Sequence, residues 1–315
     1  MCEPREPRSW GLLALKKNIP PTNIRSGHPD FELLSVLAAE IDRRAGGREQ
    51  LKIDVPEMLR ECIDYMINTP RTGRRDFEEL EKVEKTFIAT QVEIVVREYL
   101  KLKKGLLDTV ILDHDVDIKF TVGDNWMIPP EALGHPCLLI AADEVTGLCY
   151  MALFIVRSEY LHGGEGNRDE KRGISAAGFA EIYWLMREHP YPPNFWRNIS
   201  AKVVERIFAG RSGNDRIVTL FREVQERPVS REVIHAVARQ LDFMRRSRAD
   251  RGRSGLGTRE RLLQEGILLL TGTTHPQLIR AYGLPRCGRS DFISYTPRSD
   301  AEWCLAEQAG IKRDD

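Results

Sequence analysis

Four aspartates and one lysine lie in LLDTVILDHDVDIKF, residues 106–120, a segment that otherwise has strand-forming residue types. In a strand, residues two apart project from the same face, so Asp117 and Lys119 are expected to project together. Asp108 lies nine residues before Asp117, where a preceding strand or its turn could bring it back beside Asp117. Two carboxylates that converge with a backbone carbonyl, here that of Ile118, form the hard-oxygen site that Mg²⁺ prefers. A neighbouring lysine could then orient or deprotonate a water that attacks a phosphodiester.

The D-x-K spacing has a second interpretation. A charged edge strand that contains lysine is also a normal protection against aggregation. Asp113 and Asp115 share the face of Asp117 and could substitute as ligands, although solvated turn residues are the simpler account of both. Spacing alone leaves the metal site and the edge strand as open alternatives.

Glu93 is a further candidate because of its surroundings. It lies in QVEIVVREYL, which is apolar almost all round a helix, and a carboxylate is costly to bury there without a partner. A metal ion or a lysine would compensate its charge. Pairing with Arg97 or contact with solvent would also account for it, and burial arguments leave these alternatives open.

The other residues that could do chemistry form weaker patterns. The seven histidines show no metal-ligand spacing, and His114 is expected on the apolar side of its strand. The six cysteines include no CxxC pair, so we expect reduced thiols, with Cys137 and Cys149 in the core. The segment GGEG at 163–166 lacks the GK[ST] ending of a phosphate loop.

A long helix and several strands must position these residues. Apolar periodicity predicts helices over about 29–44, 56–67 and 77–102, and strands within 106–120 and over 137–144 and 148–157. Asp76 and Glu79 form a capping-box pattern before the long helix, whose predicted apolar stripe is Leu80, Val83, Phe87, Ile94 and Val95. A helix is also expected over 176–186. Helices followed by strands indicate an α/β core with a central mixed sheet.

The chain is predicted to contain two domains. Residues 1–30 are expected to form a flexible arm, 31–186 a first domain, 187–198 a proline-rich linker and 199–315 a basic second domain. The second domain is predicted to be mainly α-helical, with helices over 231–246, 259–272 and 276–283 and an arginine-rich loop between the first two. Short helices separated by tight turns fit a helix-turn-helix element that binds DNA.

The net charge of zero conceals a division along the chain. Residues 1–186 carry 24 basic and 31 acidic side chains, whereas residues 187–315 carry 23 basic and 16 acidic ones. Of those 23 basic residues 21 are arginine, which suits forked contacts to phosphate and guanine, although a GC-rich genome would give a similar bias. A basic module joined to an acidic one suggests a polyanionic partner.

Composition also limits the class of protein. Hydrophobic residues at 42% and charged residues at 30% fit a globular protein, not a disordered one. The N-terminal segment MCEPREPRSW does not resemble a signal peptide, and no run of 18 apolar residues occurs. We therefore expect a cytoplasmic protein without a membrane span.

Several of these segments together resemble the NaeI-type restriction endonucleases. They are TPRTGRRDFEELEKVEKTFIATQVEIVVREYL, then Asp108, then VDIKF, then NWMIPPEALGH, and the similarity extends from about residue 60 to the C-terminal region. This combination of motifs is far more specific than D-x-K alone. Leu107 stands where the wider PD-(D/E)xK superfamily usually has proline before the first aspartate, a departure that removes no ligand.

The resemblance implies a type IIE restriction endonuclease, a homodimer that binds two copies of a palindromic GC-rich site on double-stranded DNA. One copy would be cleaved in an α/β domain of the PD-(D/E)xK fold, and the other would bind as an effector to a domain with a helix-turn-helix (winged-helix, CAP-like) element. The family's active site corresponds here to Glu93, Asp108, Asp117 and Lys119, with Mg²⁺ held by Asp108, Asp117 and the Ile118 carbonyl. Such enzymes are functionally paired with a DNA methyltransferase.

Two other functions remain as alternatives at this point. A PD-(D/E)xK nuclease used in repair would nick or cut DNA without strict choice of sequence. A non-catalytic regulator would bind DNA through the basic helical module, and its acidic domain would serve assembly.

Overall fold

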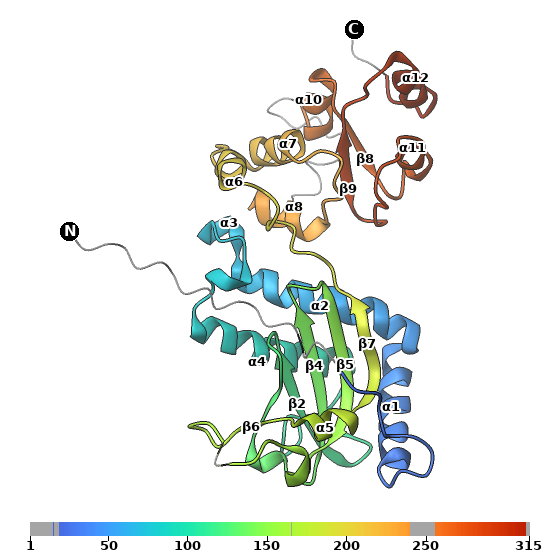
Figure 1. Ribbon diagram of the computed structural model, residues 1–315. Coiled ribbons are helices and arrows are strands. Elements are labelled where there is room, and N and C mark those ends of the chain that lie inside the picture. Colours follow the sequence, from blue (N-terminus) through green and yellow to red (C-terminus); the bar gives the residue numbers. More distant parts are fainter. Residues whose placement is uncertain (1–14, 16–18, 165, 240–255, 313–315) are drawn as a thin grey trace, which may run out of the picture. The chain divides into compact units, whose positions relative to one another are not determined.

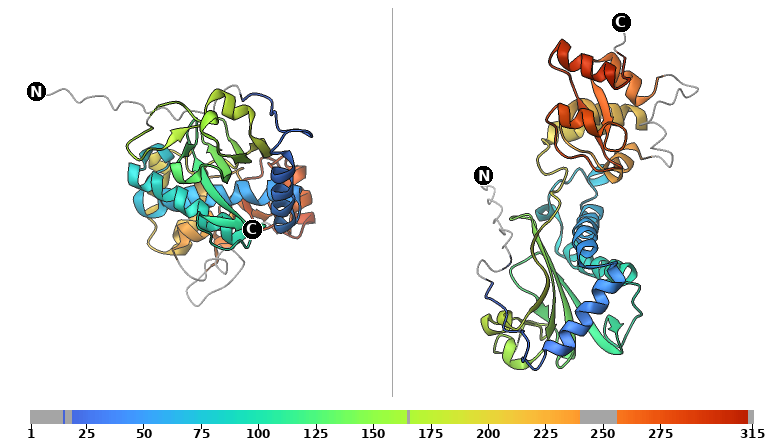
Figure 2. Two further views of the ribbon diagram at one scale, coloured as in Figure 1. Left: turned by 90° about the horizontal axis from the view of Figure 1, so that it is seen from below. Right: turned by 90° about the vertical axis from the view of Figure 1, so that its right-hand side faces the viewer.

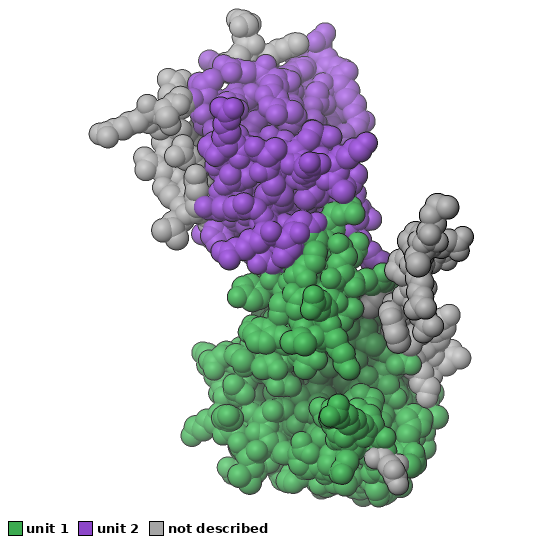
Figure 3. All heavy atoms as spheres, turned by 90° about the vertical axis from the view of Figure 1, so that its left-hand side faces the viewer, with its two compact units in different colours: residues 1–67, 74–194 green, residues 68–73, 195–315 purple. Residues whose placement is uncertain are grey.

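The computed structural model describes Leu15 and residues 19–164, 166–239 and 256–312. The chain divides into two compact units, unit 1 with residues 1–67 and 74–194 and unit 2 with residues 68–73 and 195–315 (Figure 3). Most of the predicted arginine-rich loop and residues 1–14 of the predicted arm lie outside the described residues. In the described ranges, no helix has both the length and the apolar character that a membrane crossing requires.

Unit 1 consists of a sheet, three long helices and several short elements (Figure 1). Its helices are α1 (Phe31–Ala45), α2 (Arg48–Ile67), α4 (Lys82–Tyr99) and α5 (Ala176–Ala180), with 3-10 turns η1 (Phe77–Glu79), η2 (Pro130–Ala132) and η3 (Ser158–Tyr160). Its strands are β1 (Thr109–Ile111), β2 (His114–Thr121), β3 (Met127–Ile128), β4 (Pro136–Asp143), β5 (Leu148–Ile155), β6 (Arg172–Gly173) and β7 (Tyr183–Pro190).

The central sheet of unit 1 has the strand order β1-β2-β4-β5-β7. Only β2 and β4 pair in parallel, and the other neighbours are antiparallel. The predicted α/β core with a central mixed sheet is therefore confirmed. The parallel pair matters for function, because β2 is the strand of Asp117 and Lys119.

The two faces of this sheet pack into separate apolar cores. On one face Leu138 and Ile140 pack with α1, α2 and α4, which lie on the same side of the sheet in the right-hand view of Figure 2. On the other face Leu139 packs with Trp126 and Phe179. The complete burial of β4 explains its nearly continuous apolar sequence, since a strand with two covered faces needs no polar alternation.

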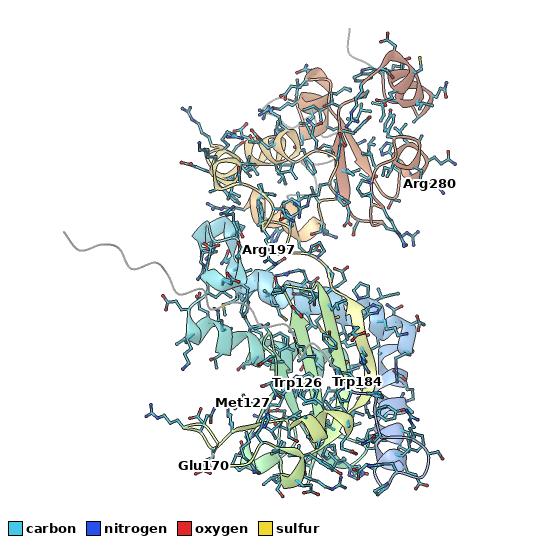
Figure 4. The ribbon with its side chains drawn as sticks, viewed as in Figure 1. Trp126, Met127, Glu170, Trp184, Arg197 and Arg280 are labelled. Carbon is cyan, nitrogen blue, oxygen red and sulfur yellow. The ribbon has the colours of Figure 1, made fainter. Side chains whose placement is uncertain are left out.

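A short ribbon made of β3 and β6 lies beyond the end of β2. Its base is fixed by Asn125, whose side-chain amide donates to the Ile174 carbonyl and accepts from the Ile174 N–H. Figure 4 shows Trp126 at the sheet, and Met127 of β3 and Glu170 of the segment before β6 on the part that projects away from it.

Three predictions for the helices of unit 1 needed correction. The helix expected at 56–67 begins at Arg48, so Pro56 lies inside it. The helix expected at 77–102 is broken: Asp76 and Glu79 do form a capping box, but it closes only the turn η1, and a second one at Glu81 begins α4. The segment expected as a helix over 176–186 is helical only in α5, and its second half enters β7.

Unit 2 is built mainly from short helices and one two-stranded sheet. Its elements are α3 (Thr69–Thr72), α6 (Ala201–Phe208), α7 (Gly213–Glu223), α8 (Arg231–Ala238), α10 (Thr258–Gln264), β8 (Leu268–Thr271), α11 (Pro276–Ala281), β9 (Phe292–Tyr295) and α12 (Asp300–Gln308). Ser230 caps α8 by accepting from the Val233 N–H, and residues 240–246 of the helix expected at 231–246 lie outside the described residues. The helix expected at 259–272 was wrong beyond Gln264, because LLLT pairs with β9 instead.

The structure can be compared with the predicted limits of the arm and of the linker. In the described part of the predicted arm, Ile19 and Ile24 are buried, and Thr22 donates to the Ile182 carbonyl. Residues 187–190, the first part of the predicted linker, lie in β7, and the change of unit falls between Asn194 and Phe195.

Candidate active site

A tight hairpin brings the two candidate aspartates together. β1 and β2 pair with Ile111 opposite His114, which leaves Leu112 and Asp113 as a two-residue turn. Both turn residues have positive φ, 48° and 64°, as the twist of a two-residue hairpin requires. Since Thr109 is opposite Val116, Asp108 lies next to Asp117 across the hairpin. The expectation that the chain returns Asp108 to Asp117 is confirmed.

The Lys119 ammonium lies among three oxygen groups. Its Nζ is 2.7 Å from Asp117 Oδ1 and 3.6 Å from Asp108 Oδ2, and it donates to the Ile118 carbonyl at 3.2 Å. Asp108 Oδ2 also accepts from the Ile118 N–H at 2.8 Å, which fixes its side chain against β2. The oxygens predicted from the sequence to hold a divalent cation thus converge on one positive charge.

Burial strengthens the interactions in this cluster. Asp117 is 3% exposed, and burial raises its pKa to about 6, although the positive charge of Lys119 opposes the shift. Burial disfavours the charged form of Lys119 as well, but the carboxylates of Asp117 and Asp108 outweigh it and raise the lysine pKa. Lys119 is therefore protonated at neutral pH.

Glu93 and Arg97 extend the cluster onto α4. Glu93 is half-buried, and burial, followed by the charge of Asp108, raises its pKa to about 7, whereas Lys119 opposes the shift. Arg97, one turn later, donates from Nη1 to the Asp108 backbone carbonyl at 3.2 Å. The four residues predicted as a site thus interact electrostatically, and α4 is tied to the loop that bears Asp108.

The two other aspartates of the segment have separate places. Asp113 is exposed in the hairpin turn, as the simpler account predicted. Asp115 is not a turn residue: it lies in β2, and its Oδ1 accepts from the Leu106 N–H at 2.7 Å. His114 was expected on the apolar side of the strand and is instead exposed at the start of β2.

Cys137 was assigned to the core and also touches the site. It lies opposite Asp117 in the parallel pairing of β4 with β2, with its Sγ 3.9 Å from Asp117 Oδ2. The pairing of two strands joined by residues 122–135 cannot be read from one sequence, so the only signal was a cysteine at the start of an apolar strand.

The donor set fits a hard divalent cation of the Mg²⁺ type. Mg²⁺ commonly takes one or two protein carboxylates and completes its shell with water and substrate phosphate. Asp108, Asp117 and the Ile118 carbonyl supply such a partial shell, and the Lys119 ammonium already contacts all three. Within the described residues, no group of three or more His, Cys, Asp or Glu side chains is arranged to enclose a metal ion. The protein would therefore supply only part of the coordination.

Comparison with known proteins gave two matches. The family model described as restriction endonuclease NaeI matches residues 53–302. The chain is also 36% identical over 238 residues to the type II restriction enzyme NaeI of Lentzea aerocolonigenes, an alignment that covers 72% of this chain and 73% of that protein. The family match includes α4, the β1–β2 hairpin and β4.

Proposed function

This chain belongs to the NaeI restriction endonuclease family, and from that premise we propose that it is a type II restriction endonuclease that hydrolyses both strands of DNA at a specific site in a Mg²⁺-dependent reaction. The proposed active site is Asp108, Asp117, Lys119 and Glu93. One observation carries this assignment: the Lys119 ammonium contacts both carboxylates and the Ile118 carbonyl. A site that holds one cation in this way is suited to hold a divalent one.

Each residue has a role that follows from its surroundings. Asp108, Asp117 and the Ile118 carbonyl would hold Mg²⁺, which when bound would supply Lewis-acid stabilisation of charge on the phosphate. Lys119, whose pKa is raised by the carboxylates of Asp117 and Asp108, would orient the attacking water and stabilise negative charge on the phosphate. Glu93 completes the acidic cluster and orients Lys119.

The proposed function also implies a fold for each unit and a set of partners. We propose that unit 1 has the PD-(D/E)xK nuclease fold. In unit 2, α7 packs against α8 and against α10, and we propose that a helix-turn-helix element among these helices binds a second DNA copy as effector. A homodimer, pairing with a DNA methyltransferase and a cytoplasmic location remain predictions of the family resemblance.

Asp117→Asn tests the assignment with little change in shape. We expect it to lower the rate of Mg²⁺-dependent plasmid cleavage by at least about 10²–10³-fold, the effect of removing one charge-stabilising group from an active site. DNA binding measured in Ca²⁺ should remain. Asp113→Asn is the matched control, because Asp113 is exposed in the hairpin turn and asparagine tolerates its positive φ. Normal cleavage by Asp117→Asn would rule out the site.

The same digestion separates the alternative functions. Mapping the ends on a sequenced plasmid should give discrete fragments with one common sequence. A smear, or nicked circles only, would instead favour a repair or nicking nuclease. Absence of metal-dependent cleavage on many DNA substrates would favour a non-catalytic DNA-binding regulator.

A further inference from the structure

Cys137 and Asp117 are neighbours on one face of the central sheet. β2 and β4 pair in parallel with these two residues opposite each other, so both side chains leave the sheet on the same side. Cys137 is 0% exposed and Asp117 is 3% exposed. The contact between them is therefore shielded from water.

The two oxygens of the Asp117 carboxylate contact different side chains. Its Oδ1 is 2.7 Å from Lys119 Nζ, and its Oδ2 accepts from Cys137 Sγ at 3.9 Å. A buried carboxylate oxygen is costly when it lacks a donor. The thiol supplies a donor to Oδ2, whereas Lys119 contacts Oδ1.

The chemistry of the thiol suits this place. A neutral S–H group donates weakly and adds no charge to a cluster that already contains three carboxylates. It can therefore hold the carboxylate without competing for the cation.

We propose that Cys137 is a positioning residue. By donating to Oδ2, it fixes the Asp117 carboxylate in the orientation needed to hold a divalent cation. The inference rests on the proposed function, since it assumes that Asp117 is a metal ligand. Groups that hydrogen-bond to metal-ligating carboxylates orient them, and their loss typically costs about 10–100-fold in metal affinity or activity. Loss of the thiol should therefore weaken metal binding while DNA binding persists.

Cys137→Ala and Cys137→Ser form the decisive pair, because they differ only in a hydroxyl that can donate. The first readout is Mn²⁺ binding to the DNA-free protein, measured by titration calorimetry, and the second is the Mg²⁺ concentration that gives half-maximal cleavage. We expect Cys137→Ala to raise the Mn²⁺ dissociation constant and the half-maximal Mg²⁺ concentration each by about tenfold. Cys137→Ser should keep both values within about twofold of the unchanged protein.

A matched control comes from the neighbouring strand. Cys149 on β5 is equally buried, but it packs in the core on the other face of the sheet, with its Sγ 4.0 Å from the Pro190 carbonyl. Cys149→Ala creates a similar cavity and should leave the Mn²⁺ affinity unchanged. If Cys137→Ala fails to fold, Cys137→Val, which fills the space without a donor, takes its place against Cys137→Ser.

The possible results separate a failure of the Cys137 positioning role from a failure of the proposed active site. Equal Mn²⁺ affinities for a folded Cys137→Ala or Cys137→Val variant and for Cys137→Ser would overturn the positioning role. Equal losses in Cys137→Ala and Cys149→Ala would overturn it too, because the effect would then be one of packing. If Asp117→Asn binds Mn²⁺ and cleaves normally, the proposed site itself is wrong.

Discussion

At the scale of single residues, the candidate site has more negative than positive charge. Glu93, Asp108 and Asp117 interact with the one ammonium of Lys119. Burial raises the pKa of Asp117 to about 6 and that of Glu93 to about 7, so neither ionises as readily as an exposed carboxyl. Such a cluster is poised to bind a further cation, and it lowers the stability of the metal-free protein at alkaline pH.

Glu93→Gln should reveal this loss of stability. Because the folded-state pKa of Glu93 is raised from 4.5 to about 7, its contribution to stability is complete below pH 4.5 and is lost as the pH rises through 7. In EDTA at pH 8 we therefore expect the variant to exceed the parent by about 1–2 kcal/mol in the free energy of unfolding, a value reduced for partial exposure. At pH 5 the two should differ little.

Urea denaturation at both pH values measures this difference. Glu98→Gln is the control, because Glu98 lies on the same helix and is exposed. If Glu93→Gln shifted stability equally at pH 5 and pH 8, ionisation of Glu93 would not be the cause.

At the scale of elements, local patterns were predictable and long-range ones were not. Alternation predicted that Asp117 and Lys119 share a face and that a preceding strand or its turn could return Asp108 to Asp117, and both predictions were correct. Cys137 was not recognised, since its position depends on a parallel pairing between separate strands. The candidate residues were therefore found from sequence, but the contact of Cys137 with Asp117 was not.

The apolar stripe predicted for the helix expected at 77–102 was wrong at three positions, whereas Leu80 is buried and Val95 packs against the core. Val83, Phe87 and Ile94 were expected to be buried, but they are 77%, 45% and 40% exposed. The buried residues of α4 are Ile88, Val92 and Val96. This helix has apolar residues on two faces. Periodicity alone does not show which of the two faces packs against the sheet. The placement of Glu93 near the site depended on this choice.

Gly105→Ala tests whether the conformation of the loop before β1 determines the position of Asp108. A Cβ at Gly105 would lie 2.8 Å from the Thr109 carbonyl oxygen and from Val110 Cγ2, and closer still to Asp115 Oδ1. The loop must therefore shift, and Asp108 with it. We expect a loss of about 1–3 kcal/mol in stability and at least a tenfold fall in cleavage rate, roughly the cost of misplacing an active-site group.

Gly163→Ala is the matched control for that variant, because a Cβ there meets no atom within 4 Å. Thermal unfolding and plasmid cleavage should show little change for Gly163→Ala. Normal cleavage by Gly105→Ala would mean that the position of Asp108 is not limited by this loop.

At the scale of the whole molecule, the charge division needs a structural correction. Part of the arginine excess in unit 2 is internal, because several arginines of its described residues pair with carboxylates of the same unit. These pairs include Arg206 with Glu223, Arg222 with Glu265, Arg261 with Asp215 and Arg298 with Glu226. By contrast Arg280, Arg286 and Arg289 are exposed around α11 and the loop before β9. Composition alone therefore overstates how many arginines are available to DNA.

The proposed effector role of unit 2 predicts communication between two DNA molecules. A plasmid with one mapped cleavage site should be cut faster when a short duplex with the same sequence is added, since the duplex would occupy the second binding site. Coupling between two binding sites is typically worth about 1–3 kcal/mol, so we expect a stimulation of about 5- to 150-fold. Initial rates over a range of duplex concentrations measure it, and a duplex of permuted sequence is the control. Stimulation by both duplexes alike would indicate nonspecific binding. A rate that only falls as the specific duplex is added would mean simple competition for one site, and unit 2 would then serve the binding of a single DNA copy.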